Sequence, residues 1–189
     1  MKRMLVVAMC VGGVIAVGAT RAEAQMTMRS FRGYFTGQAG VGVGGDASNP
    51  VLTPGASISV QEANGWGAEL DFGYSTDLEA GRQVLDVGTY MFNGNWVLPR
   101  GRLRPYAAAG LGLMQVDGCD SPCTRPAKTY DLGLSVGGGA LFLANDILGV
   151  RGDVRYFRTL ADHPDLNRPD AFGFWRLSLG VTLSWAILP

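Results

Sequence analysis

The chain has 189 residues, of which 28 are glycine, and its 16 basic and 16 acidic side chains give a formal net charge of zero. This length suits a single domain. With equal numbers of basic and acidic residues, the chain has no excess of positive charge to form the basic surface that nucleic-acid binding requires. We therefore expect no nucleic-acid partner. After the first 24 residues no apolar run is long enough to cross a bilayer as a helix. Any membrane signal in the rest of the chain must therefore lie in alternating strands.

The first 24 residues have the features of a secretory signal peptide. Lys2 and Arg3 supply a positive start, an apolar stretch rich in small residues follows, and Ala22-Glu23-Ala24 forms a small-x-small cleavage site. The apolar run is too short for a transmembrane anchor. We therefore predict a cleaved signal peptide over residues 1–24 and one domain over residues 25–189. Cleavage leaves 13 basic and 15 acidic residues, a net charge of −2.

Eight segments of this domain alternate apolar and polar residues, which is the pattern of β-strands with one apolar and one polar face. The predicted strands cover residues 34–43, 55–61, 66–75, 84–92, 103–116, 129–143, 147–158 and 172–185. In the last of them, Leu177, Leu179 and Leu183 face one side, whereas Arg176 and Ser178 face the other. Such strands behind a secretory leader predict an all-β fold, an eight-stranded antiparallel up-and-down transmembrane β-barrel with its apolar face toward lipid.

Charged residues indicate which face of a strand points inward. In the strand over residues 66–75, the reverse phase would turn Glu69 and Asp71 toward lipid at a cost of several kcal/mol, so both are predicted to face the lumen. In the strand over residues 84–92, Asp86 and Tyr90 are predicted to point inward. Four residues of that strand are then predicted to point outward: Leu85, Val87, Thr89 and Met91.

The connections between the predicted strands alternate in length. Longer polar segments cover residues 44–54, 76–83, 117–128 and 159–171, and short turns cover residues 63–65 and 144–146. The remaining link, over residues 93–102, is longer than the other two turns. This alternation predicts four extracellular loops at one end of the barrel, with periplasmic turns and both termini at the other.

The charges assigned to the inner face nearly balance in sign. The predicted lumen ion-pair network consists of Glu69, Asp71, Asp86, Arg104, Asp131, Arg151, Asp153, Arg155 and Arg176. An eight-stranded barrel is just wide enough for its own side chains to fill it, and charges inside it must pair. We interpret the network as a structural plug. Two alternatives remain open: the charges could form the filter of a narrow pore, or inward glycines such as Gly110 and Gly112 could line a small ligand cavity.

Cys119 and Cys123 are the only cysteines that remain after removal of the leader, and both lie in one predicted loop. In an oxidising compartment such a pair predicts a local disulfide. A metal site would have only Asp117 and Asp120 as further nearby ligands, and a catalytic thiol would lack a local histidine. We therefore predict a disulfide and no metal site.

Three motifs in the second half of the chain resemble a known family. Residues 104–112 read RPYAAAGLG, residues 136–140 and 151–157 read VGGGA and RGDVRYF, and residues 174–183 read FWRLSLGVTL. Together they resemble the bacterial outer-membrane β-barrel domain family, small eight-stranded barrels akin to outer membrane proteins A and X. The resemblance implies insertion into the outer membrane by the barrel-insertion machinery. The family usually ends on an aromatic residue, whereas here four residues follow Trp185.

His163 is the sole histidine of the chain. Lipid A deacylases are small barrels that use a histidine and a serine two residues apart on a strand, with a glutamate nearby. His163 lies in a predicted loop, and no serine follows at that spacing. The sequence thus predicts no catalytic residue, no cofactor and no enzymatic activity.

The patterns favour a structural or surface-interaction protein in the outer membrane of a Gram-negative bacterium, with a filled lumen. Its expected partners are outer-membrane lipid, the barrel-insertion machinery and a surface ligand bound through the loops. A narrow porin-like conduit for ions or small solutes is the first alternative. A lipid A-modifying enzyme and a soluble periplasmic ligand-binding barrel are two others. The last of these would need polar outer faces, which the apolar side of residues 172–185 contradicts.

Overall fold

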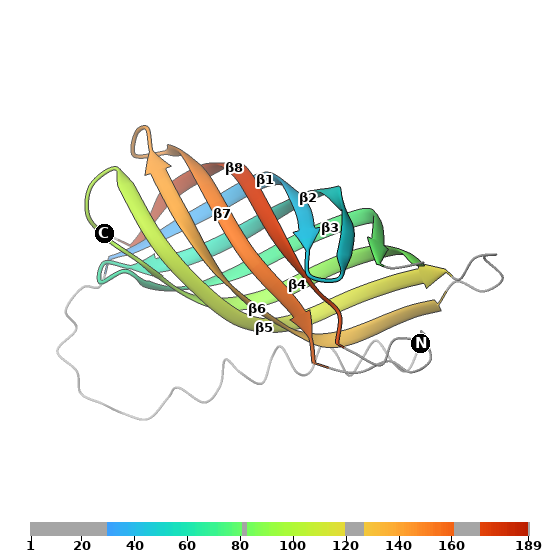
Figure 1. Ribbon diagram of the computed structural model, residues 1–189. Coiled ribbons are helices and arrows are strands. Elements are labelled where there is room, and N and C mark those ends of the chain that lie inside the picture. Colours follow the sequence, from blue (N-terminus) through green and yellow to red (C-terminus); the bar gives the residue numbers. More distant parts are fainter. Residues whose placement is uncertain (1–29, 81–82, 120–126, 161–170, 189) are drawn as a thin grey trace, which may run out of the picture.

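The computed structural model describes residues 30–80, 83–119, 127–160 and 171–188 of the chain. Its strands are β1 (Phe31–Gly44), β2 (Ala47–Glu62), β3 (Trp66–Ala80), β4 (Gln83–Val97), β5 (Leu103–Cys119), β6 (Ala127–Leu143), β7 (Leu148–Thr159) and β8 (Gly173–Leu188). Each strand pairs antiparallel with the next, and β1 pairs with β8, so the sheet closes into a barrel (Figure 1). The predicted eight-stranded antiparallel barrel is confirmed. The predicted signal peptide lies outside the described residues.

The closure between the first and last strands gives the backbone of β1 a hydrogen-bonded neighbour strand on both sides. Phe35, for example, is in register with Ile58 on β2 and with Leu183 on β8. A bilayer core offers no water to unpaired backbone groups, so a closed sheet is the form in which strands can cross it. No helix in the described part of the chain is both long enough and apolar enough to cross a membrane.

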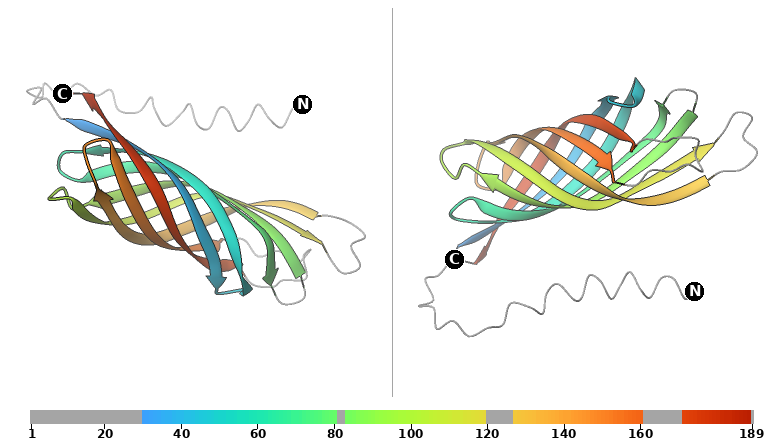
Figure 2. Two further views of the ribbon diagram at one scale, coloured as in Figure 1. Left: turned by 90° about the horizontal axis from the view of Figure 1, so that it is seen from above. Right: turned by 60° about the horizontal axis from the view of Figure 1, so that its bottom comes forward.

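The two ends of the barrel differ in their connections (Figure 2). β1 begins and β8 ends at the same end, which also holds the β2–β3, β4–β5 and β6–β7 connections. We call this the turn end. The opposite end, which we call the loop end, holds the β1–β2, β3–β4, β5–β6 and β7–β8 connections. β5 and β6 extend far toward the loop end, where they remain paired up to Gly118 and Ala127.

Most strands have the predicted phase. On β8, Leu177 and Leu179 are exposed on the outside, whereas Arg176 and Ser178 are buried in the lumen. Outward leucine, valine and aromatic side chains recur on every strand of the barrel. The outer surface is therefore apolar around the whole barrel.

The predicted phase of β4 is wrong. Leu85, Val87 and Met91 were expected outside, but each is at most 1% exposed. Tyr90 points outward instead, and its ring lies edge-on to that of Phe72 on β3, with centroids 6.1 Å apart. The reversal has a physical cause, because the lumen at the loop end is lined with apolar side chains and takes up those of β4.

Several segments predicted as loops belong to strands. β2 already begins at Ala47, β3 continues to Ala80, and β4 continues to Val97, so the predicted connections over residues 44–54, 76–83 and 93–102 are wrong. The β1–β2 hairpin turns at Gly45, whose φ of 65° suits glycine. Strand extension explains why the β4–β5 link looked too long for a turn.

Strands β2 and β3 pair with each other only in the part of the barrel near the turn end. Their ladder starts at Gly55 and Gly73, so residues 47–54 of β2 form no described ladder pairs with β3. Ala47 and residues 51–54 are in register with β1. Pro50 and Pro54 lie in this part of β2. Proline has no N–H to donate and is tolerated on a strand edge, which explains how a proline-containing segment can still be a strand.

Candidate functional site in the barrel lumen

Six of the nine charged residues predicted for the lumen meet near its middle. Glu69 and Asp71 come from β3, Arg151, Asp153 and Arg155 from β7, and Arg176 from β8. On β3 and on β7 the charged residues are two positions apart, so period-2 alternation turns them to the same face. All six are at most 7% exposed. We call this set the charge cluster.

Glu69 connects opposite walls of the barrel. Its Oε1 lies 2.6 Å from Arg155 Nη2, and its Oε2 lies 2.6 Å from Arg151 Nη1. In the closed order of eight strands, β3 and β7 have three strands between them on either side. The two ion pairs therefore cross the lumen and tie its two halves together.

Asp71 extends this bracing toward β8 and β1. Arg176 Nη2 donates to Asp71 Oδ1 at 2.6 Å, and Arg155 Nη1 lies 3.8 Å from Oδ2. Gln38 Nε2 donates to Oδ2 at 3.0 Å, and Ser178 Oγ in turn donates to Gln38 Oε1 at 3.3 Å. Asp71 is thus held by groups from three other strands.

Asp153 completes the cluster on the β7 side. Arg155 Nε donates to its Oδ1 at 2.8 Å, and Arg151 Nη2 donates to its Oδ2 at 3.2 Å. Tyr106 donates its hydroxyl proton to Asp153 and accepts a bond from Arg151 Nε at 2.7 Å. Three guanidinium groups thus face three carboxylates, and the buried cluster is formally neutral. Neutrality and dense bonding are the conditions under which buried charges are tolerated.

The other three predicted network residues lie elsewhere. Asp86 is not in the lumen: it accepts a bond from the backbone N–H of Asp77 at 3.1 Å and one from the Tyr74 hydroxyl at 3.4 Å, on the outer side of the loop end. The prediction that Asp86 points inward is wrong because the predicted phase of β4 is wrong. Arg104 faces inward, but at the turn end and away from the charge cluster. Asp131 is buried on β6 in register with Met114, nearer the loop end.

A second layer, which the sequence did not reveal, fills the lumen at the loop end. This apolar plug consists of Ala47, Val51, Leu78, Leu85, Val87, Met91, Met114, Val116, Phe157, Phe172 and Phe174. The rings of Phe157 and Phe174 stack with centroids 5.3 Å apart. The Arg176 guanidinium lies 4.7 Å from the centroid of Phe157, so the apolar plug rests directly on the charge cluster. Apolar residues on both phases of a strand, as at Leu113 and Met114, are the sequence signal for such a layer.

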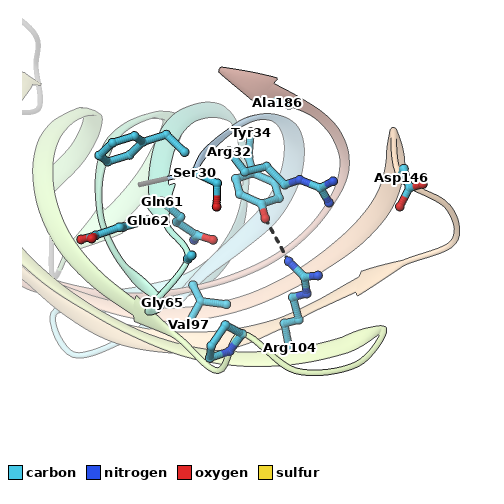
Figure 3. A pocket seen from close by; sticks show the side chains of 13 residues that line it. Ser30, Arg32, Tyr34, Gln61, Glu62, Gly65, Val97, Arg104, Asp146 and Ala186 are labelled. Carbon is cyan, nitrogen blue, oxygen red and sulfur yellow. Dashed lines mark hydrogen bonds between the residues drawn. The ribbon is translucent and has the colours of Figure 1, made fainter. Parts of the chain in front are cut away.

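The turn end of the lumen is open as a vestibule of about 500 Å³ (Figure 3). Beyond it, between Tyr34 and Arg151, lies a space of only about 10 Å³, room for about one water molecule. Further in come the charge cluster and then the apolar plug. Among the described residues the lumen therefore contains a blind vestibule below two filled layers.

The predicted disulfide and the alternative enzyme site depend on residues outside this description. Cys119 is the last residue of β5, but Cys123 lies outside the described residues, as does His163. Within the described ranges, no three His, Cys, Asp or Glu residues are grouped so that they could hold a metal ion.

Comparison with known proteins identifies the fold. No family profile matches the chain, and no curated protein sequence matches it. Neisserial surface protein A is similar in structure, with a TM-score of 0.61 and 14% identity over 81% of this chain and 96% of that one. The N-terminal β-barrel domain of Pseudomonas aeruginosa OprF has a TM-score of 0.61 and 15% identity over 84% of this chain and 100% of that domain.

A third similar structure is Ail, the attachment invasion locus protein of Yersinia pestis, in complex with the heparin analogue sucrose octasulfate. It has a TM-score of 0.54 and 16% identity over 84% of this chain and 100% of that one. The chain therefore has the fold of the small eight-stranded barrels found among bacterial outer-membrane proteins. At the level of the fold, this confirms the resemblance predicted from the three sequence motifs.

Proposed function

We propose that this protein is a non-enzymatic outer-membrane barrel with a closed lumen, which anchors and presents its loop end at the surface of a Gram-negative cell. The observation that carries the proposal is the double closure of the lumen by the charge cluster and the apolar plug. A barrel filled in this way is suited to hold its wall rigid, and recognition then falls to the loops.

The outer surface supports the membrane location. Leu179 and Val181 on β8 and Leu111 on β5 are more than half exposed, and similar residues surround the barrel. An apolar belt of this kind is the lipid-facing band of outer-membrane barrels, whereas a soluble ligand-binding barrel needs a polar outside. We propose that residues 1–24 direct export and are then cleaved off, and that the barrel-insertion machinery inserts the remaining chain into the outer membrane. The turn end then faces the periplasm.

The conduit alternative is less well supported. Ions would have to pass the Arg155–Glu69 pair, which spans the lumen, and then the stacked rings of Phe157 and Phe174. The lipid A-modifying alternative would depend on His163, and the described lumen offers no histidine to take its place.

A surface ligand remains part of the proposal. Ail, which shares the fold, has been solved with a heparin analogue, so ligand binding is compatible with a barrel of this kind. For the present chain we propose that a ligand binds through the loops.

Two measurements test the proposal. Outer-membrane fractions run on gels with and without boiling should show a heat-dependent mobility shift, because a closed barrel resists SDS until heated. Purified protein in planar bilayers should give no steady unitary conductance. Unitary steps that change in Arg155→Ala would contradict the closed lumen, and recovery of the protein in the soluble periplasm would contradict the membrane location.

A further inference from the structure

The turn-end vestibule differs from the charge cluster above it in how its arginines are paired. Arg32 and Arg104 both line it, together with Tyr34, Gln61 and a few residues of the adjoining turns (Figure 3). Arg32 and Tyr34 are two positions apart on β1 and share its inner face. Arg32 is also in register with Gln61 on β2, so the four side chains converge on one mouth.

Tyr34 holds Arg104 in position. Arg104 Nη1 donates to the Tyr34 hydroxyl at 3.1 Å, and Arg104 Nε donates to the carbonyl oxygen of Gly101 at 3.2 Å. These bonds fix the guanidinium plane and leave Nη2 and part of Nη1 for another acceptor. Arg104 is half-buried, as is Arg32.

Neither guanidinium has a carboxylate partner within the described chain. All three arginines of the charge cluster contact at least one carboxylate at 2.8 Å or less, whereas no ion pair involves Arg32 or Arg104. Two acidic residues line the same vestibule. Glu62 accepts a bond from Asn64 Nδ2 at 3.0 Å, and Asp146 lies apart on the β6–β7 turn (Figure 3).

We propose that the vestibule is a binding site for the oxyanion group, carboxylate or phosphate, of a small molecule, held between Arg32 and Arg104. Guanidinium groups match such groups with paired, charge-assisted hydrogen bonds. The Tyr34 hydroxyl and the Gln61 amide provide further polar contacts. The vestibule of about 500 Å³ admits a molecule of small-ligand size, and its blind end makes it a receptor site rather than an entrance to a pore. That this mouth faces the periplasm depends on the proposed function, whereas its chemistry does not.

The test is calorimetric titration of the mature, detergent-solubilised protein with three probes: inorganic phosphate, the dipeptide Ala-Ala, and Ala-Ala with an amidated C-terminus. Saturable binding of phosphate alone identifies phosphate as the ligand chemistry. Saturable binding of the free dipeptide but not of its amide identifies a carboxylate. Either result supports the site. If no probe saturates the protein up to about 10 mM, the proposal is overturned. That limit corresponds to a binding free energy weaker than about 3 kcal/mol. Equal binding of the dipeptide and its amide would overturn it as well.

Variants then locate the site. Arg32→Gln and Arg104→Gln should each weaken binding about tenfold or more, because each removes a charge-assisted contact. Arg104→Lys keeps the charge but loses the forked geometry, and should bind with intermediate affinity. Arg158→Gln is the matched control, because Arg158 is exposed on the outer face of β7 at the loop end. The gel mobility shift verifies that each variant is folded.

Equal weakening in Arg158→Gln would indicate non-specific charge attraction and overturn the site. The result is independent of conductance. A conducting barrel that still binds the anion would contradict the proposed function but not this site, and a closed barrel without binding would contradict the site alone.

Discussion

Arg155 Nη2 lies 2.6 Å from Glu69 Oε1, and the two residues come from strands on opposite sides of the barrel. Glu69→Ala would leave Arg155 and Arg151 without this carboxylate while both stay buried. Removing one partner of a buried pair costs about 3–5 kcal/mol. We expect a loss of that size in the free energy of unfolding, measured by urea denaturation in lipid vesicles.

A double variant provides the control for the cross-lumen pair. Glu69→Leu combined with Arg155→Met removes one charge of each sign and fills the space with apolar atoms. Such replacements are often close to neutral, so the double variant should be more stable than Glu69→Ala. If its loss instead equals the sum of the two single losses, the two side chains act independently and the bracing role is wrong.

Gly73 provides the space for Arg176 in the charge cluster. A methyl group at Gly73 would overlap Arg176 Nη1 and lie 2.9 Å from Thr89 Oγ1. Gly73→Ala should therefore displace the guanidinium from Asp71 and cost about 1–3 kcal/mol of stability. Gly37→Ala is the matched control, because no atom lies within 4 Å of its Cβ position. It should stay within about 0.5 kcal/mol of the wild type. Similar losses in both variants would mean that backbone freedom at glycine, rather than room for Arg176, is responsible.

The success and failure of sequence prediction follow from where charges lie along each strand. Glu69 and Asp71 fixed the phase of β3, and Arg151, Asp153 and Arg155 fixed that of β7, because two or three charges on one face leave no other placement in lipid. Within residues 84–92, the predicted part of β4, Asp86 is the single charged residue. The buried Asn93 and Asn95, which share the inward phase of Met91, lie beyond that predicted range. A single carboxylate near a strand end can stay outside, where it bonds to Asp77.

Sequence patterns predicted neither the apolar plug nor the strand extensions, and the reasons are related. Apolar residues that point into the lumen look the same in sequence as those that point to lipid, so the pattern does not mark Phe157 or Phe172 as lumen residues. Residues 44–54 were predicted as a connection although β2 begins at Ala47, because the missing β2–β3 ladder that tolerates Pro50 and Pro54 is a tertiary feature. The sequence did not predict that Arg32 and Arg104 line one vestibule, because Arg32 precedes the predicted first strand.

The apolar plug should stabilise the barrel without being the only closure of its lumen. Phe174→Ala removes a fully buried ring that contacts Phe157 and Phe172. We expect a loss of about 3–5 kcal/mol in unfolding free energy, as for other buried phenylalanines. Phe35→Ala, on the lipid-facing side of β1, is the control and should cost less because that ring is 44% exposed. In planar bilayers Phe174→Ala should still show no steady conductance, since the charge cluster remains below the cavity. Unitary steps in this variant would show that the plug alone keeps the lumen closed.

Cys119 and Cys123 remain predicted to form a disulfide at the loop end. Cys119 ends β5, where it is in register with Val84, so the bond would pin the start of the β5–β6 connection to the end of a paired strand. Closing so small a ring stabilises the folded state by roughly 2 kcal/mol in the chain-entropy account. Protein taken from the outer membrane should resist thiol alkylation until a reductant is added, and should then take up two alkyl groups, as mass spectrometry can measure. Cys119→Ser should expose Cys123 to alkylation without reductant. Two thiols that react before reduction in the wild type would reject the disulfide and leave the β5–β6 connection without this constraint.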